Sequence, residues 1–266
     1  MSKLLIIVLV KNEERHLPRF FKKLSGLNDF ELLVNDNGST DNSKSICQKN
    51  NAVVIEKEWL GNQAAQFNWI LDNYNIKSEW ILRLDADEYL LPDLINEINE
   101  IIANPNSFNA FYLKRRHYVS GRWIKHGMYP TNIVRLFKNG FARYDSSMLM
   151  DEHLKVTGSV STLQNDFIDE SLLSHQEWWD KHVNYAKREA NMLINSDKSQ
   201  FKKNRKLYYK TPVFVRPFIF FVIIYVFKGG FLNGKIGFRW FLYQVLFYRF
   251  LVDIYLSTIY NSKKIQ

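Results

Sequence analysis

The fold of this chain is decided by the stretch Trp80-Ile81-Leu82-Arg83-Leu84-Asp85-Ala86-Asp87. A mainly apolar run of strand length that ends in two carboxylates is typical of a buried strand with a polar site directly after it. Carboxylate oxygens are hard ligands, suited to a divalent cation that also holds phosphate oxygens. Acidic residues also cap helices and occupy turns, so the pair Asp85 and Asp87 needs support from its surroundings.

Strand-like and helix-like segments alternate on both sides of this stretch. Apolar runs of strand length cover residues 4–10, 30–34 and 52–55. Helical spacing or capping patterns predict helices over residues 13–24, 42–50, 63–73 and 92–103. Alternation of this kind predicts an α/β fold in which crossover helices connect the strands of a parallel sheet.

Polar residues follow three of these strands at the point where each strand ends. They are Lys11 to Glu14, Asp36 to Asp41, and Asp85 to Glu88. Because the carboxyl ends of parallel strands meet at one edge of a sheet, we expect the three clusters to lie together. There, a carboxylate such as Asp36 accepts a hydrogen bond from a ribose hydroxyl or a base N–H, and a cation at Asp87 neutralises a pyrophosphate. The clusters therefore predict a nucleotide-diphosphate pocket.

The pattern changes after about residue 105. Residues 108–113 and 133–137 are further strand-like runs, and a helical period resumes over residues 172–195. The basic stretch between residues 196 and 210 separates this part from the rest of the chain. We therefore expect one domain over residues 1–195 and a distinct C-terminal region over residues 196–266.

The net charge of +9 is unevenly distributed. Residues 1–180 hold 20 Lys and Arg against 24 Asp and Glu, whereas residues 181–266 hold 16 against 3. A basic region of this kind indicates an anionic partner, either nucleic acid or anionic lipid. Its basic residues are interleaved with long apolar runs, which favours lipid and argues against nucleic acid.

Two features of the composition bear on the compartment. A single cysteine, Cys47, excludes an intramolecular disulfide, as expected in a reducing compartment, and is interpreted as a small core residue. Residues 1–10 combine a short basic start with an apolar stretch but lack a small-residue cleavage site, so they are interpreted as a buried strand and not as a signal peptide.

Two apolar segments dominate the C-terminal region. The first, residues 213–227, is interrupted by Arg216 and Pro217, whereas a membrane-spanning helix needs about 20 apolar residues. The second, residues 236–260, carries several charged residues and suits an amphipathic helix lying in the bilayer interface. The alternative is that both segments pack as core helices.

The three polar clusters also resemble known motifs. Val8 to Glu14, Val34 to Ser43 and Leu84 to Glu88 are similar in sequence and spacing to motifs of glycosyltransferase family 2, the inverting nucleotide-sugar enzymes of the GT-A fold. The second motif departs from the common pattern at Asn37, where a second Asp is frequent, which leaves Asp36 as the base-binding carboxylate. The resemblance implies a Rossmann-like, mostly parallel sheet with helices on both faces, followed by a helical, basic and apolar C-terminal region.

Two further stretches, Trp59 to Trp69 and Tyr225 to Phe238, resemble bacterial members that build lipopolysaccharide core, capsule or other exopolysaccharide. They imply transfer of a sugar from a nucleoside-diphosphate-sugar to a hydroxyl of a glycan or lipid-linked acceptor. Residues 1–105 would bind the donor and residues 106–195 the acceptor, in a cytoplasmic enzyme held peripherally on the inner face of the bacterial cell membrane. The sugar, the nucleotide, the acceptor and the oligomeric state stay open.

The resemblance also implies roles for individual residues. Donor binding falls on Val10, Asn12, Glu13, Asp36, Gln66, Arg83 and Asp85. A divalent cation, Mg²⁺ or Mn²⁺, is expected on Asp87, and Asp85 is either its second ligand or a contact to the ribose or to a metal-bound water. The cation would stabilise the charge of the leaving diphosphate.

Direct displacement needs a base that takes the proton of the acceptor hydroxyl. The leading candidate is the segment Asp151-Glu152-His153, which resembles the acidic pair of the family with the two acids in reversed order. The family's base falls on Glu152, with Asp151 as the alternative, and His153 either contacts the acceptor or is a solvated histidine. Further candidates for phosphate or acceptor contacts are Arg135, His175 and Trp178, and core packing is the alternative for the tryptophan.

Two other classes of function stay open at this point. A sugar nucleotidyltransferase also combines a nucleotide fold with a metal-binding carboxylate pair. It usually carries a Gly-rich basic loop after the first strand, and Lys11 to Arg15 contain no Gly. The remaining alternative is a membrane- or nucleic-acid-binding module that uses the basic C-terminal region.

Overall fold

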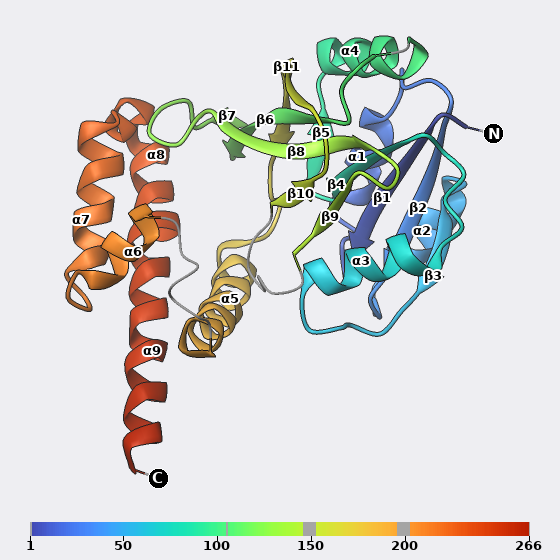
Figure 1. Ribbon diagram of the computed structural model, residues 1–266. Helices are drawn as coiled ribbons and strands as arrows, with labels where there is room; N and C mark the ends of the chain where they lie inside the picture. The colour runs from blue at the N-terminus through green and yellow to red at the C-terminus, as the bar shows by residue number, and fades with distance from the viewer. Residues whose placement is uncertain (1, 105, 146–152, 196–202, 266) are drawn as a thin grey trace. The chain divides into compact units, whose positions relative to one another are not determined.

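The computed structural model describes residues 2–104, 106–145, 153–195 and 203–265 (Figure 1). The chain forms two compact units, each described here by itself. The first comprises Met1–Gly121 and Pro130–Leu172, and the second comprises Arg122–Tyr129 and Leu173–Gln266.

The first unit alternates strands and helices, as the sequence predicts. Its elements are β1 (Leu4–Val10), α1 (Leu17–Lys23), β2 (Phe30–Asp36), α2 (Ser43–Lys49), β3 (Val53–Glu56), α3 (Gln63–Asn73), β4 (Trp80–Asp85), β5 (Glu88–Leu90), α4 (Pro92–Ala103), β6 (Ala110–Val119), β8 (Thr131–Lys138), β9 (Ala142–Tyr144), β10 (Leu154–Val156) and β11 (Val160–Asp169).

The strands of the main sheet lie in the order β3-β2-β1-β4-β8-β6-β11-β5, and β9 pairs with β10 in a separate ribbon. The first four strands of that order are all parallel, and β6 and β11 are parallel to each other. Strand β8 is antiparallel to both β4 and β6, and β5 is antiparallel to β11. The mostly parallel α/β sheet is therefore confirmed.

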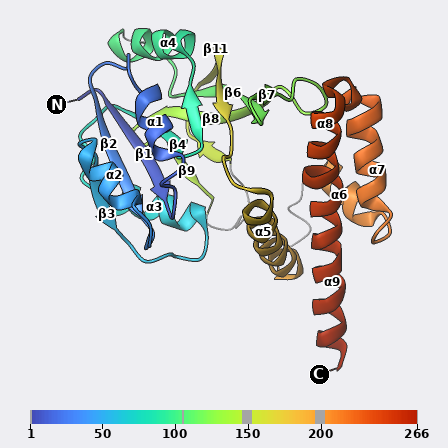
Figure 2. The same cartoon turned by 180° about the vertical axis from the view of Figure 1, so that it is seen from behind.

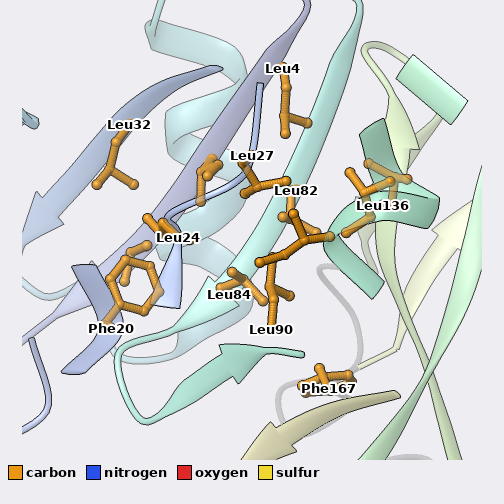
Figure 3. Packing of buried hydrophobic residues seen from close by; sticks show 14 of the residues in the cluster. Leu4, Phe20, Leu24, Leu27, Leu32, Leu82, Leu84, Leu90, Leu136 and Phe167 are labelled. Atoms are coloured by element: carbon orange, nitrogen blue, oxygen red, sulfur yellow. The ribbon is translucent and has the colours of Figure 1, made fainter. Parts of the chain in front are cut away.

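Helices cover both faces of the sheet because successive residues of each strand point to opposite sides. Leu4, Ile6 and Val8 of β1 pack into a core shared with α1, α2 and α4, which Figure 3 shows in close-up. Leu5 and Ile7 pack into a second core that contains Phe67 of α3. Each fully buried large apolar side chain contributes about 1.5–3 kcal/mol, so the central strand β1 is fixed from both sides.

Helix α1 begins at Leu17, four residues after the predicted start at Glu13. Pro18 occupies the first turn of the helix, where a proline is tolerated because the N–H it lacks has no intrahelical partner there. The preceding residues form a turn instead, and their N–H groups bond side chains of another loop: Glu13 N donates to Ser43 Oγ and Glu14 N to Asp41 Oδ2.

The second unit is mainly helical. Its elements are β7 (Arg122–Trp123), α5 (His175–Asn195), α6 (Lys203–Lys210), α7 (Arg216–Val222), the π-helical turn η2 (Ile223–Phe227), the 3₁₀ turn η3 (Gly230–Asn233), α8 (Gly234–Phe241), the π-helical turn η4 (Leu242–Phe247) and α9 (Tyr248–Ile265). Figure 2 shows these helices from behind.

Helix α5 belongs to this unit, whereas the sequence places it in the domain of residues 1–195. The boundary lies between Leu172 and Leu173, because α5 packs on α9 through Ala186, Leu193 and Val252. Charge pairs also join the helices of this unit: Glu189 accepts a hydrogen bond from the partly buried Arg249 at 2.7 Å, and Asp253 accepts one from the buried Arg216 Nε at 2.8 Å.

Within the described residues, none of the individual helices has the length and apolar character needed to cross a membrane. One pair of helices, Arg216–Phe227 with Gly230–Ile259, meets that test when taken together, although the pair is bent by 69°. Phe241, Val245 and Val252 are buried, so part of the segment 236–260 contributes to the core of the unit, whereas the segment 213–227 is mostly exposed.

We expect the thiol of Cys47 to be unreactive in the folded protein. It is fully buried, and burial, with the charges of Asp36 and Asp41, raises its pKa to about 12. Because the thiolate is the reacting species, modification by Ellman's reagent at pH 8 should be slower than in 6 M urea by about a hundredfold or more. Equal rates in the two conditions would show that the thiol is accessible, contrary to a core role.

Candidate active site

The carboxyl ends of β1, β2 and β4 meet at one edge of the sheet. In the parallel register, Val10 of β1 lies opposite Asp36 of β2, and Leu9 lies opposite Asp85 of β4. The two carboxylates therefore flank the end of the central strand on either side. The expected gathering of the polar clusters at this edge is confirmed.

The loops that follow β1 and β2 are tied to each other. Asn12 has a positive φ of 57°, which asparagine tolerates better than most residues, and its Oδ1 accepts a hydrogen bond from Thr40 N at 2.8 Å. Asn12 N in turn donates to Ser39 Oγ at 3.0 Å. Asp36 Oδ1 accepts from both the N–H and the hydroxyl of Ser39, at 2.9 and 2.7 Å. These bonds fix the loop carrying the expected base-binding carboxylate.

Asp41 adds another tie between the same loops. Its two carboxylate oxygens accept hydrogen bonds from Ser43 N and from Glu14 N, at 2.9 and 3.1 Å. Burial raises the pKa of Asp41, but these hydrogen bonds to its charged form outweigh burial and lower it overall. The carboxylate is therefore held in its ionised form.

Glu13 is oriented by His16, a residue that no sequence pattern indicates. The ring Nδ1 lies 2.5 Å from Glu13 Oε2, and Nε2 accepts a hydrogen bond from Leu172 N at 2.8 Å. Since Nε2 is the acceptor, Nδ1 carries the proton and donates it to the carboxylate. The buried histidine therefore fixes the direction of the Glu13 side chain, which lies on the same loop as Asn12.

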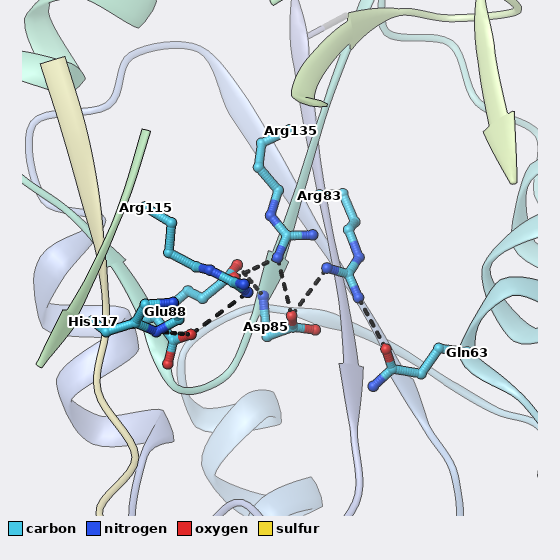
Figure 4. A network of polar contacts seen from close by, with 8 residues as sticks. Gln63, Arg83, Asp85, Glu88, Arg115, His117 and Arg135 are labelled. Atoms are coloured by element: carbon cyan, nitrogen blue, oxygen red, sulfur yellow. Dashed lines mark hydrogen bonds and ion pairs between the residues drawn. The ribbon is translucent and has the colours of Figure 1, made fainter. Parts of the chain in front are cut away.

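Two buried arginines hold Asp85 (Figure 4). Arg83 of β4 donates to Asp85 Oδ2 at 2.9 Å, and Arg135 of β8 donates to the same oxygen at 3.2 Å. The two guanidinium groups are 2% and 0% exposed, so their charges are screened little by solvent. Arg83 also reaches Gln63 Oε1 at 3.4 Å. The first carboxylate of the Asp-x-Asp pair is thus fixed from two neighbouring strands.

Glu88 completes this cluster from β5. One of its oxygens accepts a hydrogen bond from Asp85 N at 3.0 Å, and the other pairs with Arg135. Complete burial and the nearby charge of Asp85 raise the pKa of Glu88, against the opposing effects of Arg83 and Arg115. The role of Glu88 was not predicted, because only the folded sheet brings β5 and β8 together around the carboxyl group.

The charge cluster extends to the neighbouring strands β6 and β11. Arg115 and His117 of β6 both face Asp169 of β11, with nitrogen–oxygen distances of 3.6 and 3.3 Å. Figure 4 shows Arg115, His117 and Glu88 close to one another beside Asp85. Charged side chains from β4, β5, β6, β8 and β11 thus gather near Asp85.

The donor set fits a divalent cation that is shared with phosphate. Among the described residues there is no group of three or more His, Cys, Asp or Glu that could hold a metal by itself. Asp85 and Asp87 supply carboxylate oxygens only, and Mg²⁺ commonly takes one or two carboxylates with phosphate oxygens completing its shell. Asp85 Oδ2 is bound by two arginines, which neutralise part of its charge; the assignment of Asp87 as the main protein ligand stays a prediction.

Three other residues predicted to contact the donor or a phosphate are buried and bonded to groups of the protein itself. Val10 is buried, and its carbonyl oxygen accepts from Asn37 N at 2.9 Å. Gln66 is fully buried in α3, where it bonds Asn35 Oδ1 and Leu60 N and thereby holds the 57–62 loop. Arg135 is wholly buried among carboxylates, which makes it a counter-ion of Asp85 and Glu88.

The predicted acceptor side is only partly described. Asp151 and Glu152 lie outside the described residues, and His153 is exposed just before β10. His175 and Trp178 lie on α5 of the second unit, where His175 contacts Tyr243 with ring centroids 4.8 Å apart. Trp178 stacks on His182 at 3.6 Å, as expected for a packing role.

The mostly parallel sheet with carboxylates at the ends of its strands has the architecture expected of a GT-A fold. The chain belongs to glycosyl transferase family 2, whose family model matches residues 5–157. This membership decides against the nucleotidyltransferase alternative.

Relatives and a solved structure agree with this assignment. The chain is 27% identical over 209 residues to an uncharacterized glycosyltransferase of Rickettsia typhi, covering 74% of this chain and 70% of the relative. It is 25% identical over 249 residues to the lipopolysaccharide core biosynthesis glycosyltransferase LpsC of Rhizobium meliloti, covering 87% and 83%. The crystal structure of S. aureus TarS 1–349 in complex with UDP shares the fold, with a TM-score of 0.51 at 14% identity over 98% of this chain and 91% of that one.

We expect the stability of the donor loops to depend on both properties of Asn12. In Asn12→Ala, the positive φ costs about 1–2 kcal/mol, and Thr40 N also loses its acceptor. Asn12→Gly is the matched control, because it loses the same hydrogen bond but adopts the positive φ freely. The free energy of unfolding in urea should fall in the order wild type, Asn12→Gly, Asn12→Ala. An alanine variant as stable as the glycine variant would show that the conformation of Asn12 is not strained.

Proposed function

We propose that this enzyme moves a sugar from a nucleoside-diphosphate-sugar to a hydroxyl of a glycan or lipid-linked acceptor, with inversion, in the synthesis of bacterial lipopolysaccharide or capsule. The observation that carries the donor assignment is the position of Asp36 and Asp85 on either side of the end of β1. Support also comes from the similarity to LpsC, which is named for lipopolysaccharide core biosynthesis, and from the UDP bound to TarS, which shares the fold.

The donor is divided between two parts of the sheet edge. The loops that contain Asn12 and Asp36 take the nucleoside, with the Asp36 carboxylate as acceptor for a base N–H or a ribose hydroxyl. Asp87, assisted by Asp85, would hold a divalent cation, which would supply positive charge to stabilise the leaving diphosphate. Arg83 and Arg135 hold Asp85 in a fixed direction throughout, which keeps this carboxylate oriented before the donor arrives.

Transfer is a single displacement. The acceptor hydroxyl oxygen forms a bond to the anomeric carbon as the bond from that carbon to the diphosphate oxygen breaks, and the hydroxyl proton passes to a carboxylate base. Glu152 is proposed as the base, with Asp151 as the alternative, on the resemblance of this segment to the acidic pair of the family. Attack from the side opposite the leaving group inverts the anomeric configuration.

The proposed site of action is the inner face of the cell membrane. A lipid-linked acceptor is confined to that surface, so a peripheral enzyme there meets its substrate at high local concentration. The excess of 16 basic over 3 acidic residues in residues 181–266 supports attraction to anionic lipid.

Donor binding is expected to require both the cation and Asp87. A screen of nucleoside diphosphates by thermal shift should identify one that raises the melting temperature with Mg²⁺ or Mn²⁺ and not with EDTA. At a ligand concentration 100 times Kd, the stabilisation is about 2.7 kcal/mol. Asp87→Ala should abolish this shift, whereas Asp72→Ala, which removes an exposed carboxylate of α3, should keep it. A full shift in EDTA would contradict a role of the cation in donor binding.

Removal of the base is expected to separate transfer from binding. Glu152→Gln should retain the cation-dependent thermal shift but lower transfer by about 10²–10⁴-fold, the usual contribution of a positioned general base. The measurement is transfer of radiolabelled sugar from the donor to a bacterial glycolipid fraction, with Asp151→Asn as the paired variant. Full turnover by Glu152→Gln would move the base to Asp151 or to another residue.

A further inference from the structure

The second unit carries a continuous series of exposed apolar side chains, here called the apolar face. Its members are Val215, Phe218, Ile219, Val222, Ile223, Val226, Phe227, Phe231, Leu232 and Phe238. Those on α7 and η2 recur every three or four residues, so they lie along one side of that helix. Large exposed apolar patches on a folded protein mark sites of contact with a partner or a membrane.

The part of the apolar face around Phe227 is held in place by the tightly packed turn that follows it. Phe227 is 79% exposed, and the chain then turns through Gly229, whose φ is 73°. The next residue, Gly230, has no room for a side chain: a Cβ there would lie 2.9 Å from Tyr225 Cα and 3.0 Å from the ring of Phe241. Asn233 Oδ1 accepts hydrogen bonds from the N–H groups of residues 125 and 126 of the same unit, at 2.7 and 3.0 Å. The exposed phenylalanine therefore projects from a fixed support.

The charge around this face has one sign. Residues 211–252 contain five basic residues and no Asp or Glu. Two of the five, Arg216 and Arg249, form ion pairs with Asp253 and Glu189 inside the unit. The other three, Lys228, Lys235 and Arg239, are exposed beside the apolar residues.

Two of these cations line a hollow in the surface. Lys235 and Arg239 lie one turn apart on α8 and border a cavity of about 670 Å³. Tyr225, Phe231 and Phe238 line the same cavity. A site with two cations and aromatic walls suits a ligand that carries an anionic group next to an apolar chain.

The charge pattern discriminates between possible occupants of the apolar face. Pairing of two copies through this face would bring Lys228, Lys235 and Arg239 toward the same cations of the other copy, without an acidic residue between 211 and 252 to offset the repulsion. Nucleic acid would meet the cations but leave the phenylalanines in water. An anionic bilayer suits both the exposed apolar side chains and the positive charge around them. Its acyl region accepts the apolar side chains, and its phosphates pair with the cations.

We propose that the apolar face lies in the interface of an anionic bilayer and that the hollow at Lys235 and Arg239 binds a lipid phosphate. The proposed contact surface is thus formed by residues 215–239, and it includes only the first residues of the 236–260 segment that the sequence suggests. Phe241, Val245 and Val252 of that segment are buried and contribute to the core instead. The inference deepens the proposed function, on which it rests for the location of the acceptor. Its test measures lipid binding alone, without donor or transfer.

The test is sedimentation of the full-length protein with vesicles of phosphatidylcholine, with and without the anionic lipid phosphatidylglycerol. The wild type should bind the anionic vesicles and lose binding as salt rises. Phe227→Ser/Phe231→Ser/Leu232→Ser should remove binding. Lys235→Gln/Arg239→Gln should weaken it about tenfold or more, since each cation near an anionic surface contributes about 1 kcal/mol.

Matched controls separate the local site from overall charge. Lys22→Gln/Lys49→Gln removes the same charge from exposed positions of the first unit, and Phe141→Ser removes an exposed aromatic there. Both should bind vesicles like the wild type. Equal weakening by the two charge variants, unchanged binding by the triple variant, or equal binding to neutral vesicles would each overturn the proposal.

Two further measurements distinguish the remaining outcomes. Sedimentation velocity without lipid would reveal a dimer that the triple variant dissociates; a dimer of this kind without vesicle binding would assign the face to a second copy and overturn the proposal. The cation-dependent thermal shift with nucleoside diphosphate should be unchanged in every variant. Vesicle binding without any such shift would refute the proposed function and leave the lipid site standing.

Discussion

The site depends on the pairing of Asp85 and Glu88 with two arginines inside the sheet. Removing such charges from water costs several kcal/mol per ion, and only close partners offset that cost. Here Arg135 bridges both carboxylates, and Arg83 holds the first from its own strand. Because these charges balance only when β4, β5 and β8 are correctly placed, the cluster couples the geometry of the Asp-x-Asp pair to completion of the sheet.

Sequence patterns predict the part of the site that depends only on residues directly following a strand. Asp36 and Asp85 each end an apolar strand, and the parallel arrangement alone brings strand ends to one edge, so their meeting was predictable. Helix α1 was predicted to start too early, since Glu13 and Glu14 suit a first turn by composition. Their N–H groups are bound instead by side chains 27 to 30 residues away, which no local pattern records.

The contacts that sequence analysis missed are tertiary ones. Glu88 belongs to the motif that follows β4, but its ion-pair partner Arg135 lies 47 positions later, on an antiparallel strand, so the motif alone does not indicate the pair. His16 was absent from the predicted site because its two hydrogen bonds join Glu13 to Leu172. Helix α5 was assigned to the wrong unit for a similar reason. Its apolar side chains pack against α9, which follows it by more than 50 residues.

The mutual hydrogen bonding of the two donor loops has a thermodynamic consequence. Asn12 is hydrogen-bonded to both Ser39 and Thr40, so the two loops proposed to bind the donor are joined by the protein's own hydrogen bonds, and little chain entropy remains to be lost when a nucleotide binds. The free energy of donor binding then includes a smaller ordering cost than in an enzyme whose loops become ordered only around the donor. A pocket whose loops are already ordered discriminates between ligands by its shape and by the polar groups that a wrong ligand leaves unpaired. A nucleotide with the wrong base therefore binds less tightly, because the loops do not rearrange to accept it.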